Sequence, residues 1–218
     1  MSEKIKLTVI GGGPGGYVAA FLAADLGMDV TLVDLEKNPG GVCLYRGCIP
    51  SKALLHVAKL IHEAEDAKNW GIEFGKPQIN INKLRDFKDN VVNKLTGGLG
   101  QISKQRKINF IQGRASFISS SALKIEKVDG QTIEQSFDKA IVATGSVITS
   151  IPSLNIQSKR LLNSTSALDL PGIPKSLLVI GGGYIGLELG SVYQALGTKV
   201  SVVEMMPGLL PGADRDLV

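Results

Sequence analysis

LTVIGGGPGGYVAAFLAADLGMDVTLVD, residues 7–34, and LLVIGGGYIGLELGSVYQALGTKVSVVE, residues 177–204, are two copies of one pattern. They align without a gap over their whole length, and the glycine cluster and the later Leu-Gly are among the positions that are identical. Each copy consists of an apolar run, a glycine cluster, a helical stretch that stops at Leu-Gly, and a second apolar run. This order predicts a strand, a turn, a helix and a strand in each copy.

The glycines and a later acid in each copy have the spacing of a dinucleotide-binding fingerprint. The glycines are Gly11, Gly13 and Gly16 in the first copy and Gly181, Gly183 and Gly186 in the second. An acid follows the third glycine at the same spacing in both copies, as Asp34 and Glu204. The glycines permit a tight turn, a close approach to pyrophosphate and close packing of helix on strand, while the acid binds ribose hydroxyls. The helix that opens there presents unpaired N–H groups to the phosphates.

The acid of the second copy bears on the choice of cofactor. A ribose 2′-phosphate beside Glu204 would be repelled, and Met205 and Met206 follow where an Arg would be needed to receive it. The second copy therefore favours NAD over NADP.

The rest of the chain predicts further helices and short strands. We expect a helix within 47–72 and another over 81–107, with Gly97-Gly98 as its weak point. We expect strands at 108–112, 122–128, 132–137 and 139–143, with Asp129-Gly130 as a hairpin turn. Residues 146–175 are rich in Pro, Ser and Asn and predict a connection to the second copy. The fold class is α/β, with two Rossmann-like units in residues 1–147 and 148–218 and a small β-meander.

Composition excludes several classes of protein. Of the 218 residues, 24 are Lys or Arg, 20 are Asp or Glu and 44% are hydrophobic, which indicates a globular chain rather than a disordered one. No apolar stretch reaches the length of a membrane span. The basic residues are dispersed without interleaved aromatics, which argues against nucleic-acid binding. The N-terminus leaves no room for a signal peptide, so we expect a cytoplasmic protein.

The only two cysteines, Cys43 and Cys48, lie in the segment GGVCLYRGCIPSK, residues 40–52. A disulfide across so short a loop would stabilise the fold by only about 2 kcal/mol, so a structural staple is a poor explanation. Zinc lacks a four-ligand spacing here. Cys48 precedes a helix start, and Arg46 and Lys52 add positive charge. In a cytoplasmic chain beside a dinucleotide site, this pair indicates redox chemistry.

The chain resembles the flavin-dependent pyridine nucleotide–disulfide oxidoreductases, and within that family the lipoamide enzymes. The resemblance is carried by the two glycine motifs, by residues 40–52, by ATGS at 143–146 and by GGGYIGLELG at 181–190. It implies units of the three-layer ββα type, with FAD on the first repeat and NAD on the second. Ser51-Lys52 suits the lipoamide enzymes better than glutathione reductases, which tend to carry two lysines there.

Roles for individual residues are implied by the same resemblance. Cys43 would be the thiol that meets the substrate, Cys48 the thiolate next to the flavin, and Lys52 would lie near the flavin, paired with Glu188. The implied cofactor-binding residues are Gly11, Gly13, Pro14, Gly15, Gly16, Asp34, Gly41, Val42, Cys43, Cys48, Lys52, Ala115, Thr144, Gly145, Ser146, Gly181, Gly183, Tyr184, Ile185, Gly186 and Glu204. No metal site is expected.

The implied reaction is the oxidation of protein-bound dihydrolipoamide through a Cys43–Cys48 disulfide and FAD to NAD. The implied partners are a lipoyl-bearing acyltransferase of a 2-oxoacid dehydrogenase complex and a second copy of the full-length chain. Alternatives are a mercuric or glutathione type of reductase, or a nucleotide-binding fragment without catalysis.

Three features differ from the family pattern. Only the short segment 205–218 follows Glu204, so we expect a truncated second unit and a chain that is part of a longer protein. The family's acid–base His-Glu pair belongs to a later domain, and His56 and His62 are interpreted as ordinary helix positions, so the fragment alone is expected to be inactive. Tyr45-Arg46 replaces a common Asn-Val, and Tyr184 replaces an aliphatic residue.

Overall fold

The computed structural model describes residues 4–149, 151–154 and 156–218. Its residues cluster into two compact units, one of residues 1–45 and 92–147 and one of residues 46–91 and 148–218. The second unit thus includes 46–91 along with the second repeat. The expected domains 1–147 and 148–218 stay a prediction, because compactness alone does not define a functional domain.

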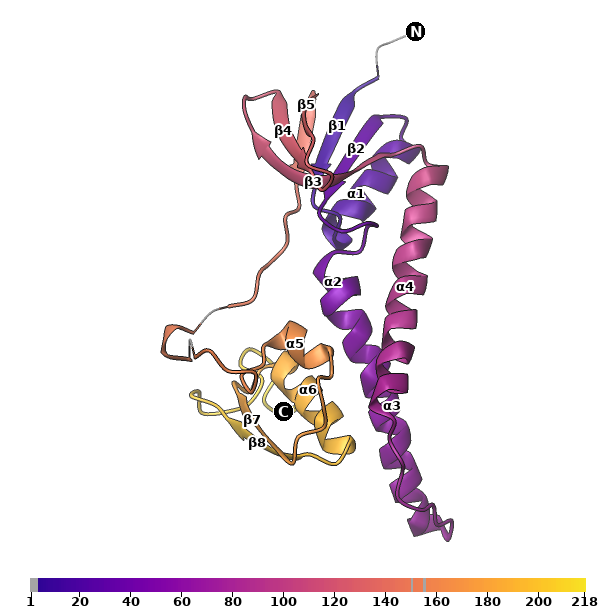
Figure 1. Ribbon diagram of the computed structural model, residues 1–218, viewed down its shortest axis with the longest axis vertical. Coiled ribbons are helices and arrows are strands. Elements are labelled where there is room, and N and C mark those ends of the chain that lie inside the picture. The colour runs from indigo at the N-terminus through magenta and orange to yellow at the C-terminus, as the bar shows by residue number, and fades with distance from the viewer. Residues whose placement is uncertain (1–3, 150, 155) are drawn as a thin grey trace. The chain divides into compact units, whose positions relative to one another are not determined.

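The first unit is built around one sheet of six strands (Figure 1). Its elements are β1 (Lys6–Ile10), α1 (Pro14–Asp25), β2 (Asp29–Asp34), most of α2 (Gly41–Arg46), the second half of α4 (Ile81–Gln105), β3 (Asn109–Phe117), β4 (Ala122–Lys127), β5 (Thr132–Ser136) and β6 (Lys139–Val142). The strand order is β5-β4-β3-β2-β1-β6. β3, β2, β1 and β6 run parallel, and β4 and β5 add an antiparallel extension through β3. The parallel part has the strand order of a dinucleotide-binding half, as predicted.

Strands β1 and β2 are buried on both faces, so apolar residues of these strands occur on either face. Leu7, Val9 and Leu32 pack with Ala20 and Ala23 of α1 on one face. The other face forms a separate cluster; its members are Ile10, Val33, Ile111, Leu123, Ile125 and Phe137.

The structure confirms the helix expected over 81–107 and extends one of the expected strands. Gly97-Gly98 does not interrupt α4, which continues to Gln105. Each glycine costs a helix about 1 kcal/mol relative to Ala, and burial of Val92, Thr96 and Gly100 on one stripe of this helix offsets that cost. The strand expected at 108–112 extends to Phe117, because its last residues pair with β4.

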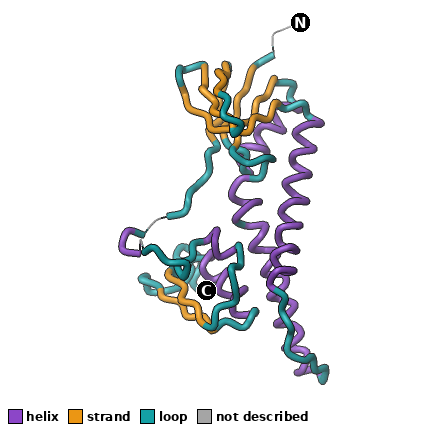
Figure 2. The backbone as a smooth tube through the Cα atoms, viewed as in Figure 1, coloured by secondary structure: helices purple, strands orange, loops and turns teal. Residues whose placement is uncertain are grey.

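The second unit contains the second repeat and the helix that follows the cysteines (Figure 2). Its elements are α3 (Cys48–Asp66), η1 (Ala67–Trp70), the first half of α4, η2 (Pro152–Leu154), α5 (Ser164–Leu168), β7 (Ser176–Ile180), α6 (Tyr184–Ala195) and β8 (Lys199–Val203). β7 and β8 pair in parallel as a sheet of two strands. Helix α5 was not predicted in the 146–175 connection, although Asn163 and Ser166 form its capping box. Residues 150 and 155 of that connection lie outside the described residues.

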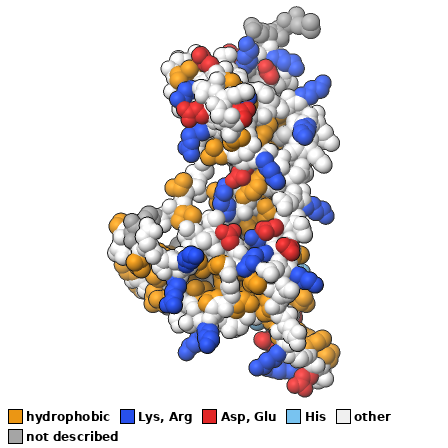
Figure 3. Space-filling model, in the orientation of Figure 1, with side chains coloured by type: hydrophobic (Ala, Val, Ile, Leu, Met, Phe, Trp, Pro, Cys, Tyr) orange, Lys and Arg blue, Asp and Glu red, His pale blue; other side chains and the backbone are white. Residues whose placement is uncertain are grey.

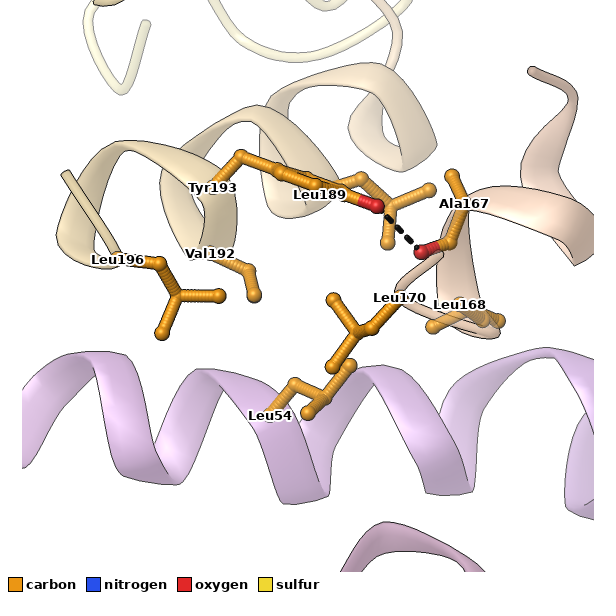
Figure 4. Close-up of a cluster of buried hydrophobic side chains, with 8 residues drawn as sticks. All are labelled: Leu54, Ala167, Leu168, Leu170, Leu189, Val192, Tyr193 and Leu196. Carbon is orange, nitrogen blue, oxygen red and sulfur yellow. Dashed lines mark hydrogen bonds between the residues drawn. The ribbon is translucent and has the colours of Figure 1, made fainter. Parts of the chain in front are cut away.

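Leucines from three helices form the core of the second unit (Figure 4). Leu54 of α3 points toward Leu170, while Leu189 and Val192 project from α6. Tyr193 is fully buried, and its hydroxyl donates a hydrogen bond to the carbonyl oxygen of Ala167 at 2.9 Å. Packing of α3 on α6 therefore brings the segment after the cysteines to the second repeat.

The surface agrees with the dispersed charge of the sequence. On the face of the described residues seen in Figure 3, Lys and Arg side chains are scattered rather than gathered into one patch. Among the described residues, no helix is both long and apolar enough to cross a membrane.

We predict that Leu54→Ala lowers the free energy of unfolding by about 2–5 kcal/mol, because it leaves a cavity in the core of the second unit. Leu60→Ala on the same helix is the matched control, since Leu60 is 61% exposed and Leu54 only 1%. Urea unfolding measures both. Equal losses in the two variants would contradict the packing described here.

Candidate functional site

The first glycine loop joins β1 to α1 with almost no spare volume. Gly11 has a φ of +104°, a conformation that favours glycine, and its N–H donates to the carbonyl oxygen of Val33 at 2.8 Å. A Cβ on Gly16 would collide with the carbonyl oxygen of Gly11. Glycine at these two positions thus allows the turn and lets the helix start lie against the strand end.

The second glycine loop repeats this geometry. Gly181 also has a φ of +104°, and its N–H donates to Val203 at 2.8 Å. A Cβ on Gly186 would lie 2.7 Å from the carbonyl oxygen of Gly181 and 2.8 Å from Cγ1 of Val179. Gly13 and Gly183 stand at the N-caps of α1 and α6 in extended conformations. In each copy, the amino end of the helix therefore lies directly at the glycine loop, and this arrangement suits a bound phosphate.

The two acids close these loops by the same hydrogen bonds. Asp34 accepts from the N–H of Gly12 at 2.5 Å and from that of Glu36 at 2.8 Å. Glu204 accepts from the N–H of Gly182 at 2.6 Å and from that of Met206 at 2.8 Å. A carboxylate has about four lone-pair positions, so acceptor capacity remains for ribose hydroxyls.

The sequence comparison missed how far the repeat extends. The N–H of Gly40 donates to the carbonyl oxygen of Gly12 at 2.7 Å, and that of Leu210 donates to Gly182 at 2.9 Å. Each donor follows its acid at the same offset, beyond the end of the aligned segments 7–34 and 177–204. Extending the alignment of the two copies beyond Asp34 and Glu204 would have paired Gly40 with Leu210.

Hydrogen bonds also set the ionisation of Glu204. The N–H of Met206, and then that of Gly182, hold the pKa of this carboxyl below its ordinary value of 4.5. The carboxylate is therefore charged at neutral pH, as repulsion of a 2′-phosphate requires.

The third predicted binding segment adjoins the first glycine loop. The N–H of Ala143 donates to the carbonyl oxygen of Ile10 at 2.8 Å, and a Cβ on Gly11 would lie 3.1 Å from the nitrogen of Thr144. Gly145 has a φ of +74° and, like Ser146, is exposed. The ATGS segment thus follows β6 at the edge of the sheet where Gly11 lies.

Other predicted binding residues lie on several elements. Gly41 opens α2 with its Cα 3.8 Å from the Cβ position of Gly13, and Val42 beside it is exposed. Pro14 and Gly15 begin α1, and Ala115 lies on β3, opposite Ile125 of β4.

Tyr184 and Ile185 begin α6, and their side chains are 67% and 45% exposed. No group of three or more metal-ligating side chains occurs among the described residues.

The cysteines occupy two consecutive helices. Cys43 lies within α2 and is half-buried, whereas Cys48 is the first residue of α3 and is exposed. Cys48 thus lies at the amino end of α3, a helix of 19 residues.

The predicted partnership of Lys52 and Glu188 is present in the second unit. The ammonium nitrogen of Lys52 lies 2.5 Å from Oε1 of Glu188. Lys52 is largely exposed, so the pair contributes about 0–1 kcal/mol to stability and its importance lies in position. Ser51, which sequence reasoning gave no role, is buried and hydrogen-bonds Oε2 of Glu188 and the carbonyl oxygen of Cys48, each at 3.2 Å. Glu188 is thereby connected to the first turn of α3.

Comparison with known proteins agrees with these motifs. Residues 5–217 match the family described as pyridine nucleotide-disulphide oxidoreductase. The chain belongs to this family. A dihydrolipoyl dehydrogenase of Vibrio cholerae is 47% identical over the whole chain, and one of Haemophilus influenzae is 48% identical. A mitochondrial dihydrolipoyl dehydrogenase of Arabidopsis thaliana is 42% identical over 99% of the chain.

Structural similarity leads to the same family. The Cu(II) complex of the HOCl-induced flavoprotein disulfide reductase RclA from Escherichia coli matches 96% of the chain with a TM-score of 0.77 and 29% identity. The chain spans only 44% of that structure and 46% of the two bacterial relatives. The chain thus corresponds to about half the length of these relatives.

We predict that Gly16→Ala destabilises the chain by about 1–3 kcal/mol, because the added methyl group has no room beside Gly11. Gly15→Ala is the control, since a Cβ at Gly15 meets nothing within 4 Å. Thermal unfolding of the two variants measures the difference. A Gly16→Ala protein as stable as Gly15→Ala would show that the loop is not tightly packed.

We also predict that Glu204→Gln reduces stability at neutral pH, since the amide replaces one of the two acceptor oxygens. The lowered pKa of Glu204 makes its stabilising contribution complete above 4.5 and lost as the pH falls through the lower, folded-state value. The difference in unfolding midpoint between parent and variant should therefore shrink with acidification. Glu73→Gln, at an exposed glutamate, should show no such trend. A difference that stays constant with pH would contradict the assignment.

Proposed function

We propose that the chain is the part of a dihydrolipoyl dehydrogenase that binds FAD, carries the redox-active cysteines and begins the NAD site. One observation carries the proposal: the Cys43–Cys48 motif leads into a helix whose Lys52 is paired with Glu188 of the second repeat. The identity of 47% to a protein named dihydrolipoyl dehydrogenase supports lipoamide as the substrate.

The residues present fit two dinucleotides. A side chain at Gly11 or Gly16 would collide with the backbone near the first loop, and one at Gly186 would collide with Gly181 in the second. The first loop lies in the same unit as Cys43, which fits FAD there. The second loop has the charged Glu204 followed by exposed methionines, which fits NAD rather than NADP.

Each of the candidate catalytic residues has a different role in the proposed reaction. One thiol of dihydrolipoamide attacks Cys43 of the Cys43–Cys48 disulfide, which forms a mixed disulfide and releases the sulfur of Cys48. The second substrate thiol then displaces Cys43 and closes the cyclic disulfide, so that the substrate loses two electrons and two protons and the cysteine pair gains the two electrons. Cys48, at the start of α3, carries the sulfur proposed to lie next to the flavin. Lys52 provides a positive charge whose position Glu188 and Ser51 fix. FAD, when bound, supplies the path for the electron pair from the dithiol to NAD⁺.

The partners follow from the substrate. Protein-bound lipoamide implies a lipoyl-bearing acyltransferase of a 2-oxoacid dehydrogenase complex, and the complete protein is proposed to be a homodimer. A reducing cytoplasm suits a cysteine pair that must cycle between thiol and disulfide.

A second candidate is a disulfide reductase of the RclA, mercuric or glutathione type. Such an enzyme would transfer electrons from a nicotinamide cofactor to a disulfide or a metal ion. The structural similarity to RclA favours it, and the charged Glu204 argues against an NADPH-dependent form. Preference of the full-length protein for NADPH would select this candidate.

The absorption spectrum of the chain reconstituted with FAD tests the proposal. We expect a flavin spectrum that gains a long-wavelength thiolate-to-flavin band after mild dithiol reduction. Cys43→Ser should show this band without reductant, because Cys48 then has no disulfide partner, and Cys48→Ser should never show it. A bound flavin that gives no such band in any of the three proteins would overturn the assignment of Cys48.

A further inference from the structure

Tyr45 connects the helix that carries Cys43 to two other segments of the first unit. Its hydroxyl donates to the carbonyl oxygen of Asn38 at 3.1 Å. Its ring and Thr96, a fully buried residue of α4, both lie within contact distance of the Cβ position of Gly40. Burial raises the pKa of the Tyr45 phenol, so the group remains a hydrogen donor throughout the neutral range.

The packing around this bond leaves little freedom. A Cβ on Gly40 would lie 3.0 Å from Cβ of Leu44, 3.1 Å from Cε2 of Tyr45 and 3.1 Å from Cγ2 of Thr96. The loop between Asp34 and α2 is thus enclosed by α2 on one side and α4 on the other.

The same loop holds the first dinucleotide motif. The N–H of Gly40 donates to Gly12, and Gly41, with a φ of +57°, lies so close to Gly13 that a side chain there would collide with it. Cys43 lies on α2 between this contact and Tyr45. One end of the short helix therefore contacts the glycine loop through Gly13, and the other end is bonded to Asn38 in the loop that follows Asp34.

The second repeat has an independent counterpart of this contact. Tyr45 follows Asp34 at the same offset in the chain as Arg215 follows Glu204. The guanidinium of Arg215 donates to the carbonyl oxygens of Leu209 and Leu210 at 3.0 and 2.8 Å. In both copies, a side chain at the same position reaches back to the loop that follows the acid, with different chemistry in each.

We propose that Tyr45 is a positioning residue that fixes the Cys43 helix to the loop that follows Asp34 and so restrains the reactivity of Cys43. The consequence for substrate exchange depends on the proposed function, because it assigns Cys43 to that step. The restraint itself depends only on the contacts within the first unit.

Cysteine alkylation of the reduced, nucleotide-free chain tests the proposal without flavin. Iodoacetamide labelling is quenched over time, and trypsin, which cleaves after Arg46, places Cys43 and Cys48 on separate peptides for mass spectrometry. In Tyr45→Phe, which removes only the hydroxyl, we expect Cys43 to react about fivefold faster, the equivalent of one lost hydrogen bond. Cys48 should keep its parental rate.

Tyr17→Phe is the matched control, because the Tyr17 ring packs beside Phe21 of α1 in the same unit. It should leave both rates unchanged. An unchanged Cys43 rate in Tyr45→Phe would overturn the proposal, as would an equal acceleration of both cysteines, which would indicate general loosening. Absence of flavin binding would instead count against the proposed function and leave this result intact.

Discussion

The close approach of strand, turn and helix at each glycine loop is the constraint on which the remaining structure depends. Gly16 against Gly11, and Gly186 against Gly181, leave no room for side chains. Each loop is then closed by a carboxylate from the next strand, Asp34 or Glu204. One set of contacts thus fixes the helix start, the strand order and the position of the acid. These are the three features that a dinucleotide site requires.

The segment that carries the two cysteines is held by packing on both sides of them. Gly41 contacts the first loop, and α3 packs its Leu54 into the core shared with α6. The second contact explains how Lys52 meets Glu188, a residue 136 positions away. Lys52 is therefore placed by apolar packing at Leu54, two residues further along the same helix.

Much of this was predictable because the repeat encodes it locally. The glycine positions, both strands of each copy, the helix after the cysteines and the Lys52–Glu188 pair all agree with expectation. Local patterns could not reveal α5, whose five residues depend on the Asn163 cap and on packing under α6. Nor could they show how α4 tolerates Gly97-Gly98, since burial elsewhere on the helix compensates for glycine. The contacts of Ser51 and Tyr45 depend on tertiary placement, which spacing alone does not specify.

The two repeats are proposed to be separate sites for two different dinucleotides. Calorimetric titration of the chain with NADH, first alone and then after saturation with FAD, tests this proposal most directly. We expect FAD to occupy the site at the first glycine loop and to leave the affinity and stoichiometry of NADH at the second loop unchanged. Loss of NADH binding upon saturation with FAD would show that the two ligands compete for one loop, and would contradict the assignment of two separate sites.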